Sequence, residues 1–383
     1  MTPHPPLSAR PIEGLRYRGP LAPRLRPTES ELSGHNYKTL LTAAQQALLV
    51  VVENKLCCGR VVFLKTVGVV TSGGDAPGMN AAIRGVVRIG HAKGLQFLGF
   101  EKGWEGLITG TFRPLIPRSV GGIIQLGGTI LLTSRCPEFK TLKGIRKAAE
   151  TLGANNVDGL VVIGGNGSIN GAYELSKETG TQIVAIPASI DNDVFGTDET
   201  IGFDTAVNTA VVEIDKIRDT AISLERVFIV EVMGRTRGFL ASTVGITVGA
   251  EVILVPEVKI DKEKMFKVIK ENSAKGKKSG IIVAAEGIGD TRKLAMEIER
   301  ETGKEVRLSI LGYAQRGGSP TARSRLLASL FANKAIEILL QNHGNRVVGL
   351  QNGEISSIDL KKSCDNEKKL DFGLLDLAYE LAT

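Results

Sequence analysis

The chain has 383 residues, of which 42% are hydrophobic and 5% aromatic, enough to bury one large or two medium cores. No apolar run approaches the roughly 18 to 20 residues that a membrane-spanning helix needs, and the four cysteines form neither a disulfide framework nor a paired zinc-binding pattern. These properties predict no membrane span and a reducing, cytoplasmic setting.

The formal net charge of +7 is concentrated near the amino end of the chain. Residues 1–65 hold nine lysines and arginines against four glutamates, so the remaining 318 residues carry a net charge of only +2. A protein that binds nucleic acid needs a basic face on its folded body. The sequence therefore predicts no nucleic-acid partner.

The first 65 residues form an N-terminal extension. Residues 1–35 are rich in Pro and Arg and show neither helical nor strand periodicity, which predicts disorder. Residues 36–65 fit a helix followed by a short strand. A targeting peptide is an alternative for this basic, acid-poor start, although its proline content and missing amphipathic period weigh against it.

From residue 66 the chain alternates short apolar runs with longer helical segments. Uniformly apolar runs are typical of parallel strands that helices cover on both faces. We therefore expect an α/β fold of two doubly wound lobes with largely parallel sheets. A helix that packs into the core is expected over 199–223. The expected strands are 66–71, 95–100, 157–165, 181–187, 226–232, 250–256, 279–287 and 306–312.

Two of these strands end in glycine turns that lead into helices. In the segment TSGGDAPGMNAAIRG, Gly73 and Gly74 let the backbone approach a ligand closely, and the helix that opens near Pro77 points its amide dipoles at the same place. The segment GGNGS at 164–168 repeats the arrangement. Both turns predict anion binding, with tight packing as the alternative for either one alone. The chain contains no GxxxxGK[ST] motif.

Acidic and basic side chains gather at other strand ends. In IPASIDND, Asp191 and Asp193 flank an asparagine, which suits a proton acceptor and a metal partner; an Asx turn that caps the next helix is the alternative. Four arginines near strand ends offer planar forks for a phosphate ester, namely Arg226, Arg235, Arg307 and Arg316. Together with the glycine turns, these residues predict phosphoryl transfer to a sugar phosphate.

Several long motifs follow one another in order over about residues 66–350, among them TSGGDAPGMNAAIRG, SRCPEFK, GGNGS, SIDND, GTDETIGFDTA, EVMGR and LGYAQRGGSP. With these motifs the chain resembles the ATP-dependent 6-phosphofructokinases of bacterial type. The resemblance implies transfer of phosphate from ATP to the 1-hydroxyl of fructose 6-phosphate, giving fructose 1,6-bisphosphate, the committed step of glycolysis, with Mg²⁺ as cofactor. It also implies a homotetramer, with ADP or phosphoenolpyruvate as allosteric effectors.

The resemblance also implies an active-site cleft between the two lobes, and it gives the parts of the chain different roles. An ATP-binding lobe is expected over 66–200 and a sugar-phosphate-binding lobe over 201–320. Residues 321–383 are expected to form a C-terminal helical region and tail, part of which returns to the ATP-binding lobe.

The resemblance carries functional roles onto the matching residues. Asp191 is the expected base, assisted by Gly74, Ser189 and Arg235, and we expect its pKa to lie near the ordinary value. The expected ATP site consists of Gly74, Arg135, Cys136, Gly165, Asn166, Gly167 and Ser168, with Ile108 where the family often has an aromatic residue. The residues expected to hold fructose 6-phosphate are Ser189, Asp191, Asp193, Met233, Gly234, Arg235, Glu286, Tyr313 and Arg316, with Arg226 and Arg307 from a neighbouring subunit.

Two further expectations follow from the resemblance. Small residues at Gly167 and Ala188, where pyrophosphate-using members carry Asp and Lys, favour ATP as the donor. The expected effector pocket between subunits consists of Arg84, Arg88, Arg218, Glu251, Lys275 and Lys277, while one further family arginine is replaced by Pro117.

The chain departs from the family at the expected metal site. Asn166 stands where the family has an aspartate that helps to hold Mg²⁺, so Asn166 and Asp193 are the expected metal-site residues. We expect an active kinase with weakened affinity for Mg²⁺ or lowered turnover. A catalytically weak, nucleotide-binding regulatory or structural protein is the alternative. Ser189 for the usual threonine and Tyr313 for the usual histidine are further departures.

Overall fold

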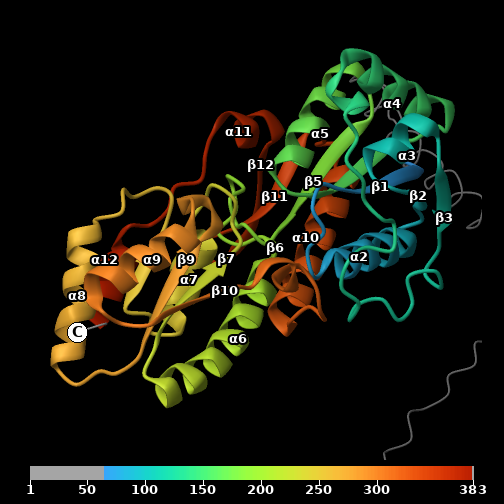
Figure 1. Ribbon diagram of the computed structural model, residues 1–383. Coiled ribbons are helices and arrows are strands. Elements are labelled where there is room, and N and C mark those ends of the chain that lie inside the picture. Colours follow the sequence, from blue (N-terminus) through green and yellow to red (C-terminus); the bar gives the residue numbers. More distant parts are fainter. Residues whose placement is uncertain (1–63, 382–383) are drawn as a thin grey trace, which may run out of the picture. The chain divides into compact units, whose positions relative to one another are not determined.

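The computed structural model describes residues 64–381, so the predictions for residues 1–63 lie outside the described residues. The described residues form two β-sheets with helices packed around them (Figure 1). In the larger sheet the strands β5, β4, β1 and β2 run parallel, while β12 and β3 run antiparallel at its edges. Its order is β12 (Glu354–Asp359), β11 (Arg346–Gln351), β5 (Gln182–Ser189), β4 (Gly159–Gly164), β1 (Thr66–Ser72), β2 (Gln96–Phe100) and β3 (Phe112–Leu115), and β6 (Ile201–Gly202) pairs with β5.

Helices cover both faces of the larger sheet. Because successive side chains of a strand point to opposite faces, Val161 of β4 belongs to one buried cluster and Val162 to another. The first face is covered by α2 (Met79–Ala92) and α10 (Ala322–Leu340), which pack against each other. The second face is covered by α3 (Trp104–Thr109), α4 (Leu142–Ala154), α5 (Asn166–Glu178), α11 (Leu360–Asp365) and the short η1 (Glu138–Lys140).

The smaller sheet is fully parallel and is also covered on both faces. Its order is β10 (Val306–Ile310), β7 (Val227–Val232), β9 (Gly280–Ala285) and β8 (Val252–Leu254). One face packs against α6 (Phe203–Leu224), α7 (Phe239–Thr247) and α12 (Gly373–Leu381). The other face packs against α8 (Lys262–Ala274) and α9 (Thr291–Thr302), and the short turns η2 (Glu286–Ile288) and η3 (Gly312–Arg316) follow β9 and β10.

The expected class of fold is confirmed, because each of the eight apolar runs forms a strand and both sheets are largely parallel. The expected helix over 199–223 starts later, at Phe203, because residues 201–202 pair with β5 instead. Residues 321–383 are not only helical, since 346–359 form the β11–β12 hairpin on the larger sheet. Among residues 64–381, no helix is long and apolar enough to cross a membrane.

Candidate functional site

The carboxyl ends of two neighbouring strands of the larger sheet, β1 and β4, carry most of the expected nucleotide-site residues. After β1, Gly73 adopts a left-handed φ of 83° and its carbonyl accepts a hydrogen bond of 2.8 Å from the Thr133 hydroxyl. After β4, helix α5 begins at Asn166, directly behind Gly165. A side chain added at Gly167 would meet no atom within 4 Å, so this turn leaves open space above it.

Ser168 joins the two glycine turns. A side chain added at Gly73 or Gly164 would approach the Ser168 hydroxyl to 3.0 or 2.5 Å, so the three residues are packed closely. The hydroxyl is buried and has no hydrogen-bond partner among the described residues. A buried polar atom without a partner is costly, and backbone amides at a helix start attract anions. These turns are therefore suited to an anionic ligand.

An open cavity of about 440 Å³ lies beside the first glycine turn. Arg135 and Cys136 follow its lining directly in sequence; Arg135 is exposed, and Cys136 and Ile108 pack against the buried cluster of the second sheet face. Sequence reasoning did not find most of the lining, because its polar residues other than Asp75 and Ser134 lie in loops outside the recognised motifs. The lining residues are Asp75, Lys102, Glu105, Gly128, Thr129, Leu132, Thr133 and Ser134.

The two expected carboxylates lie in the turn after β5, and Asp191 is the more buried of them. Burial and the neighbouring Asp193 raise the pKa of Asp191 from 3.8 to about 6, against the opposing effect of Arg235. The expectation that this pKa lies near its ordinary value is therefore wrong, because the burial of the group is a tertiary property. Asp191 is still mostly ionised at neutral pH.

Residues that follow strands of the smaller sheet contact the turn that holds Asp191. The Arg235 guanidinium lies 3.4 Å from the Asp191 carboxylate, and the Arg235 backbone amide donates a 2.6 Å hydrogen bond to Glu286. Arg235 itself adopts a left-handed φ of 53°. Gly234 precedes it, and the Met233 amide donates to the Gln315 side chain at 3.4 Å. Residues that follow β5, β7 and β9 are thus brought together.

Arg316 forms a second bridge between the residues of the two sheets. Its guanidinium lies 2.8 Å from the carboxylate of Asp75 in the first glycine turn. A side chain added at Gly74 would come within 2.4 Å of the same guanidinium, so Gly74 allows this close approach. Tyr313 is largely exposed, and its ring centre lies 5.8 Å from Arg316.

Two of the four expected arginines lie elsewhere. Arg226 precedes β7 and Arg307 is the second residue of β10, so both stand at the amino ends of parallel strands, away from Arg235 and Arg316. Both are ion-paired with Glu305, Arg226 at 2.6 Å. The sequence did not separate this pair from Arg235 and Arg316, because an apolar run does not show which of its flanking residues stands at the carboxyl end.

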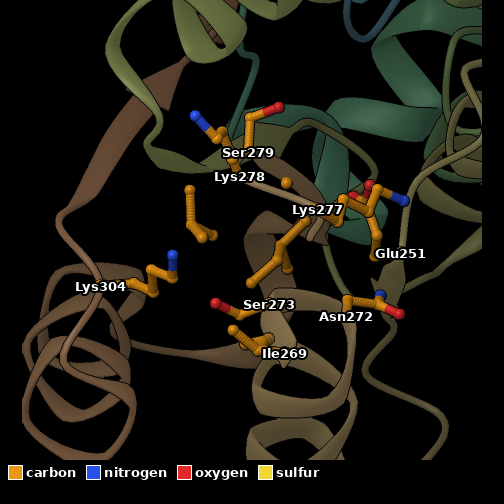
Figure 2. Close-up of a pocket in the computed structure, with 11 residues that line it drawn as sticks. Glu251, Ile269, Asn272, Ser273, Lys277, Lys278, Ser279 and Lys304 are labelled. Atoms are coloured by element: carbon orange, nitrogen blue, oxygen red, sulfur yellow. The ribbon is translucent and has the colours of Figure 1, made fainter. Parts of the chain in front are cut away.

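The expected effector residues form two groups. Lys277 pairs with Glu251 at 2.6 Å, and Figure 2 shows both beside a cavity of about 20 Å³, room for about one water.

The other expected effector residues do not line this cavity. Arg218 donates to the carbonyl of Val248, on the same lobe, and Lys275 is exposed at the end of α8. Arg84 and Arg88 lie one turn apart on α2, and within residues 64–381 no hydrogen bond or ion pair links them to Glu251 or Lys277.

The expected metal site offers few ligands of its own. The Asn166 amide group donates a 3.1 Å hydrogen bond to the backbone carbonyl of Asp193, which brings the two residues together. Among the described residues, no group of three or more His, Cys, Asp or Glu side chains could hold a metal ion. The site therefore fits only an ion that takes most of its ligands from phosphate and water, as Mg²⁺ commonly does.

Comparisons with known proteins cover most of the chain. Residues 66–339 match the family model described as phosphofructokinase. A protein of Clostridium botulinum described as ATP-dependent 6-phosphofructokinase is 50% identical over 319 residues, 83% of this chain and all of that protein. A Thermus thermophilus protein described as ATP-dependent 6-phosphofructokinase 1 is 49% identical over 321 residues and is also covered in full.

A solved structure agrees with these sequence relatives. The phosphofructokinase of Saccharomyces cerevisiae superposes with a TM-score of 0.73 at 34% identity over 79% of this chain. This chain spans 45% of the length of that yeast chain. From these matches we conclude that the protein belongs to the phosphofructokinase family.

Proposed function

We propose that this protein is an ATP-dependent 6-phosphofructokinase, which transfers the terminal phosphate of ATP to the 1-hydroxyl of fructose 6-phosphate. The observation that carries the proposal is the buried carboxylate of Asp191, which faces Arg235 from the other lobe at 3.4 Å, close to two glycine turns suited to phosphate. The full-length relatives with about half of their residues identical support the choice of donor and acceptor.

In the proposed reaction Asp191 accepts the proton of the sugar 1-hydroxyl. A carboxylate with a pKa of about 6 is a stronger base than an ordinary aspartate and is still ionised at pH 7. The hydroxyl oxygen then forms a bond to the terminal phosphorus of ATP, and the bond to the bridging oxygen breaks, which releases ADP. Arg235 and Gly74 support the charge of the transferred group, and Ser189 helps to place the hydroxyl.

Mg²⁺ is part of this proposal. Asp193, through its carboxylate, and Asn166, through its amide oxygen, are the residues that would hold the ion, together with phosphate oxygens and water. Bound there, Mg²⁺ would neutralise charge on the nucleotide phosphates. The hydrogen bond that the Asn166 amide nitrogen donates to the Asp193 carbonyl fixes this side chain without using its oxygen, the atom that would contact the ion or a water bound to it.

The open space at Gly167 supports ATP rather than pyrophosphate as the donor, because the rest of a nucleotide needs room beyond its phosphates. Ala188 adds nothing to this argument, since its side chain is buried in the core. We place ATP on the lobe of 66–200, against Gly74, Arg135, Cys136 and 165–168, and fructose 6-phosphate on the lobe of 201–320.

A homotetramer completes the proposed site. Arg226 and Arg307 lie at the amino ends of their strands, away from the Asp191 site of their own chain. We therefore assign them to the fructose 6-phosphate site of a neighbouring subunit. The separation of Arg84 and Arg88 from Glu251 and Lys277 supports an effector pocket for ADP or phosphoenolpyruvate formed by two subunits. We also propose that the enzyme works in the cytoplasm, where glycolysis takes place.

A steady-state assay tests the proposed function. Fructose 1,6-bisphosphate formation is measured with ATP or pyrophosphate as the donor while Mg²⁺ is varied. We expect turnover with ATP that saturates with Mg²⁺, and little turnover with pyrophosphate. The alternative of a catalytically weak regulatory protein is not favoured by the relatives; nucleotide binding without turnover at any Mg²⁺ concentration would establish it instead.

The variant Asn166→Asp is expected to lower the Mg²⁺ concentration needed for half-maximal rate. The added carboxylate is a better Mg²⁺ ligand than an amide, although the hydrogen bond from Asn166 to the Asp193 carbonyl is lost. The measurement is the rate of the wild type and the variant across a Mg²⁺ titration, with Asn208→Asp, at an exposed position of α6, as the control for added charge. An unchanged Mg²⁺ requirement would place the ion away from residue 166.

A further inference from the structure

A short segment near the carboxyl end of the chain crosses from one lobe to the other. It lies between α11, which packs beside the larger sheet, and α12, which packs against α7 and β8 of the smaller sheet (Figure 1). Two adjacent residues in this segment, Glu367 and Lys368, make contacts in opposite directions. These contacts end close to the residues that carry the proposed chemistry.

Lys368 fastens the segment to the loop after β5. Its ammonium group donates a 2.8 Å hydrogen bond to the backbone carbonyl of Asp198 and lies 5.1 Å from the ring centre of Phe239, at the start of α7. Burial lowers the pKa of Lys368 to about 8, while Asp198, Asp193 and Glu199 act in the opposite direction. The side chain is therefore mostly charged at neutral pH, within the electrostatic reach of Asp193.

Glu367 fastens the same segment to the loop after β7. Its carboxylate lies 2.7 Å from the guanidinium of Arg237. Arg237 stands two residues after Arg235, which faces Asp191, and its charge also acts on Asp193. The segment thus contacts both loops that form the bridge between the lobes.

The carbonyl that accepts from Lys368 also accepts from Asn192, the residue between the two aspartates. The Asn192 amide group donates to it at 3.2 Å, and the Asn192 oxygen accepts the Thr200 backbone amide at 3.0 Å. Asn192 is buried and adopts a left-handed φ of 53°, a conformation that asparagine tolerates better than most residues. This hydrogen bonding fixes the direction in which Asp191 and Asp193 leave the backbone.

We propose that Lys368 is a positioning residue, which holds the Asp191–Asp193 turn in its reactive arrangement through the carbonyl of Asp198 and the side chain of Asn192. The proposal rests on the function proposed above for Asp191, and it adds a residue of the C-terminal segment to that site. A displacement of the base by about 1 Å can cost a large factor in rate, so a residue that fixes this turn affects kcat more than substrate binding.

The test compares Lys368→Met with Lys368→Arg, and uses Lys369→Met, at an exposed neighbouring position, as the matched control. Methionine keeps the length of the side chain but cannot donate, whereas arginine can. We expect Lys368→Met to lower kcat about tenfold with the KM values for ATP and fructose 6-phosphate changed less than twofold. Lys368→Arg should recover most of the lost kcat, and Lys369→Met should match the wild type.

Amide hydrogen exchange supplies a readout that does not depend on activity. In Lys368→Met we expect faster exchange over 190–202, which includes the Thr200 amide, with unchanged exchange over 159–164 of β4 as the internal reference. If kcat and the exchange of 190–202 match those of Lys369→Met, or if the loss appears in KM alone, Lys368 does not position the turn. A wild type that forms no fructose 1,6-bisphosphate overturns the proposed function, and the exchange result then decides the positioning role by itself.

Discussion

Replacing Asp191 with asparagine is expected to lower kcat by about 10²–10⁴-fold, the usual contribution of a general base. The substitution keeps the shape of the side chain and its place beside Arg235, but removes the group that accepts the proton. KM for both substrates should change much less than kcat. The matched control is Asp365→Asn, an exposed aspartate at the end of α11. A kcat within tenfold of the wild type would mean that Asp191 is not the base.

The same variant is expected to be more stable than the wild type at pH 7. Because the folded protein raises the pKa of Asp191 from 3.8 to about 6, the folded state holds this proton more tightly than the unfolded state does. The ionised carboxylate therefore costs stability, progressively as the pH rises from about 4 to 6 and fully above that range. The difference between the two pKa values corresponds to about 3 kcal/mol.

Thermal unfolding at two pH values measures this effect. Asp191→Asn should unfold at a higher temperature than the wild type at pH 7.5, and the difference should shrink toward zero near pH 4. The pH dependence of the rate should reflect the same Asp191 carboxyl group, so that kcat/KM of the wild type falls as the pH drops below about 6. A variant less stable than the wild type at pH 7.5 would contradict the unfavourable burial of this carboxylate.

Replacing Arg316 with glutamine is expected to lower kcat/KM for fructose 6-phosphate by about 10–150-fold, the loss of one charged hydrogen bond of about 1.5–3 kcal/mol. Arg316 bridges to Asp75 at 2.8 Å and is placed by our proposal on the sugar phosphate. Fructose without its phosphate is the informative second substrate, since the variant should lose much of the preference for the phosphorylated sugar. Arg300→Gln, at an exposed position of α9, is the control.

An independent route to the same effect is Gly74→Ala. The added methyl group would lie 2.4 Å from the Arg316 guanidinium and would push it out of place. We expect a smaller loss than for Arg316→Gln, in the same direction. If Arg316→Gln lowers the unfolding temperature but leaves the preference for fructose 6-phosphate intact, Arg316 serves only to hold Asp75.

The fold could be predicted largely because parallel strands covered on both faces are uniformly apolar, as in the run that became β4. Of the strands that were missed, β3, β6 and β12 lack this signal, whereas β11 contains a buried apolar run, VVGL, that was not recognised. β3 is short and contains Pro114, and β12 lies at the sheet edge with its side chains mostly half-buried or exposed. Both pair with the preceding strand of the chain, β3 with β2 and β12 with β11.

The candidate site was predictable wherever a motif lies in one stretch of sequence, as in the glycine turns and the SIDND segment. The remaining features depend on tertiary contacts. Arg316 meets Asp75 across 241 positions of sequence, and Lys368 meets Asp198 across 170. The raised pKa of Asp191 arises from burial and from Asp193 together, and only the first needs the folded structure to be known.

The measurement that tests the central claim most directly is the formation of fructose 1,6-bisphosphate from fructose 6-phosphate and ATP by the wild type and Asp191→Asn, at low and high Mg²⁺. Phosphorus NMR identifies the position of the new phosphate. We predict that the wild type makes the 1,6-bisphosphate at a rate that rises with Mg²⁺ and that Asp191→Asn is slower by at least two orders of magnitude at both concentrations. A wild type that binds ATP but forms no bisphosphate, or equal rates for the two proteins, would contradict the account.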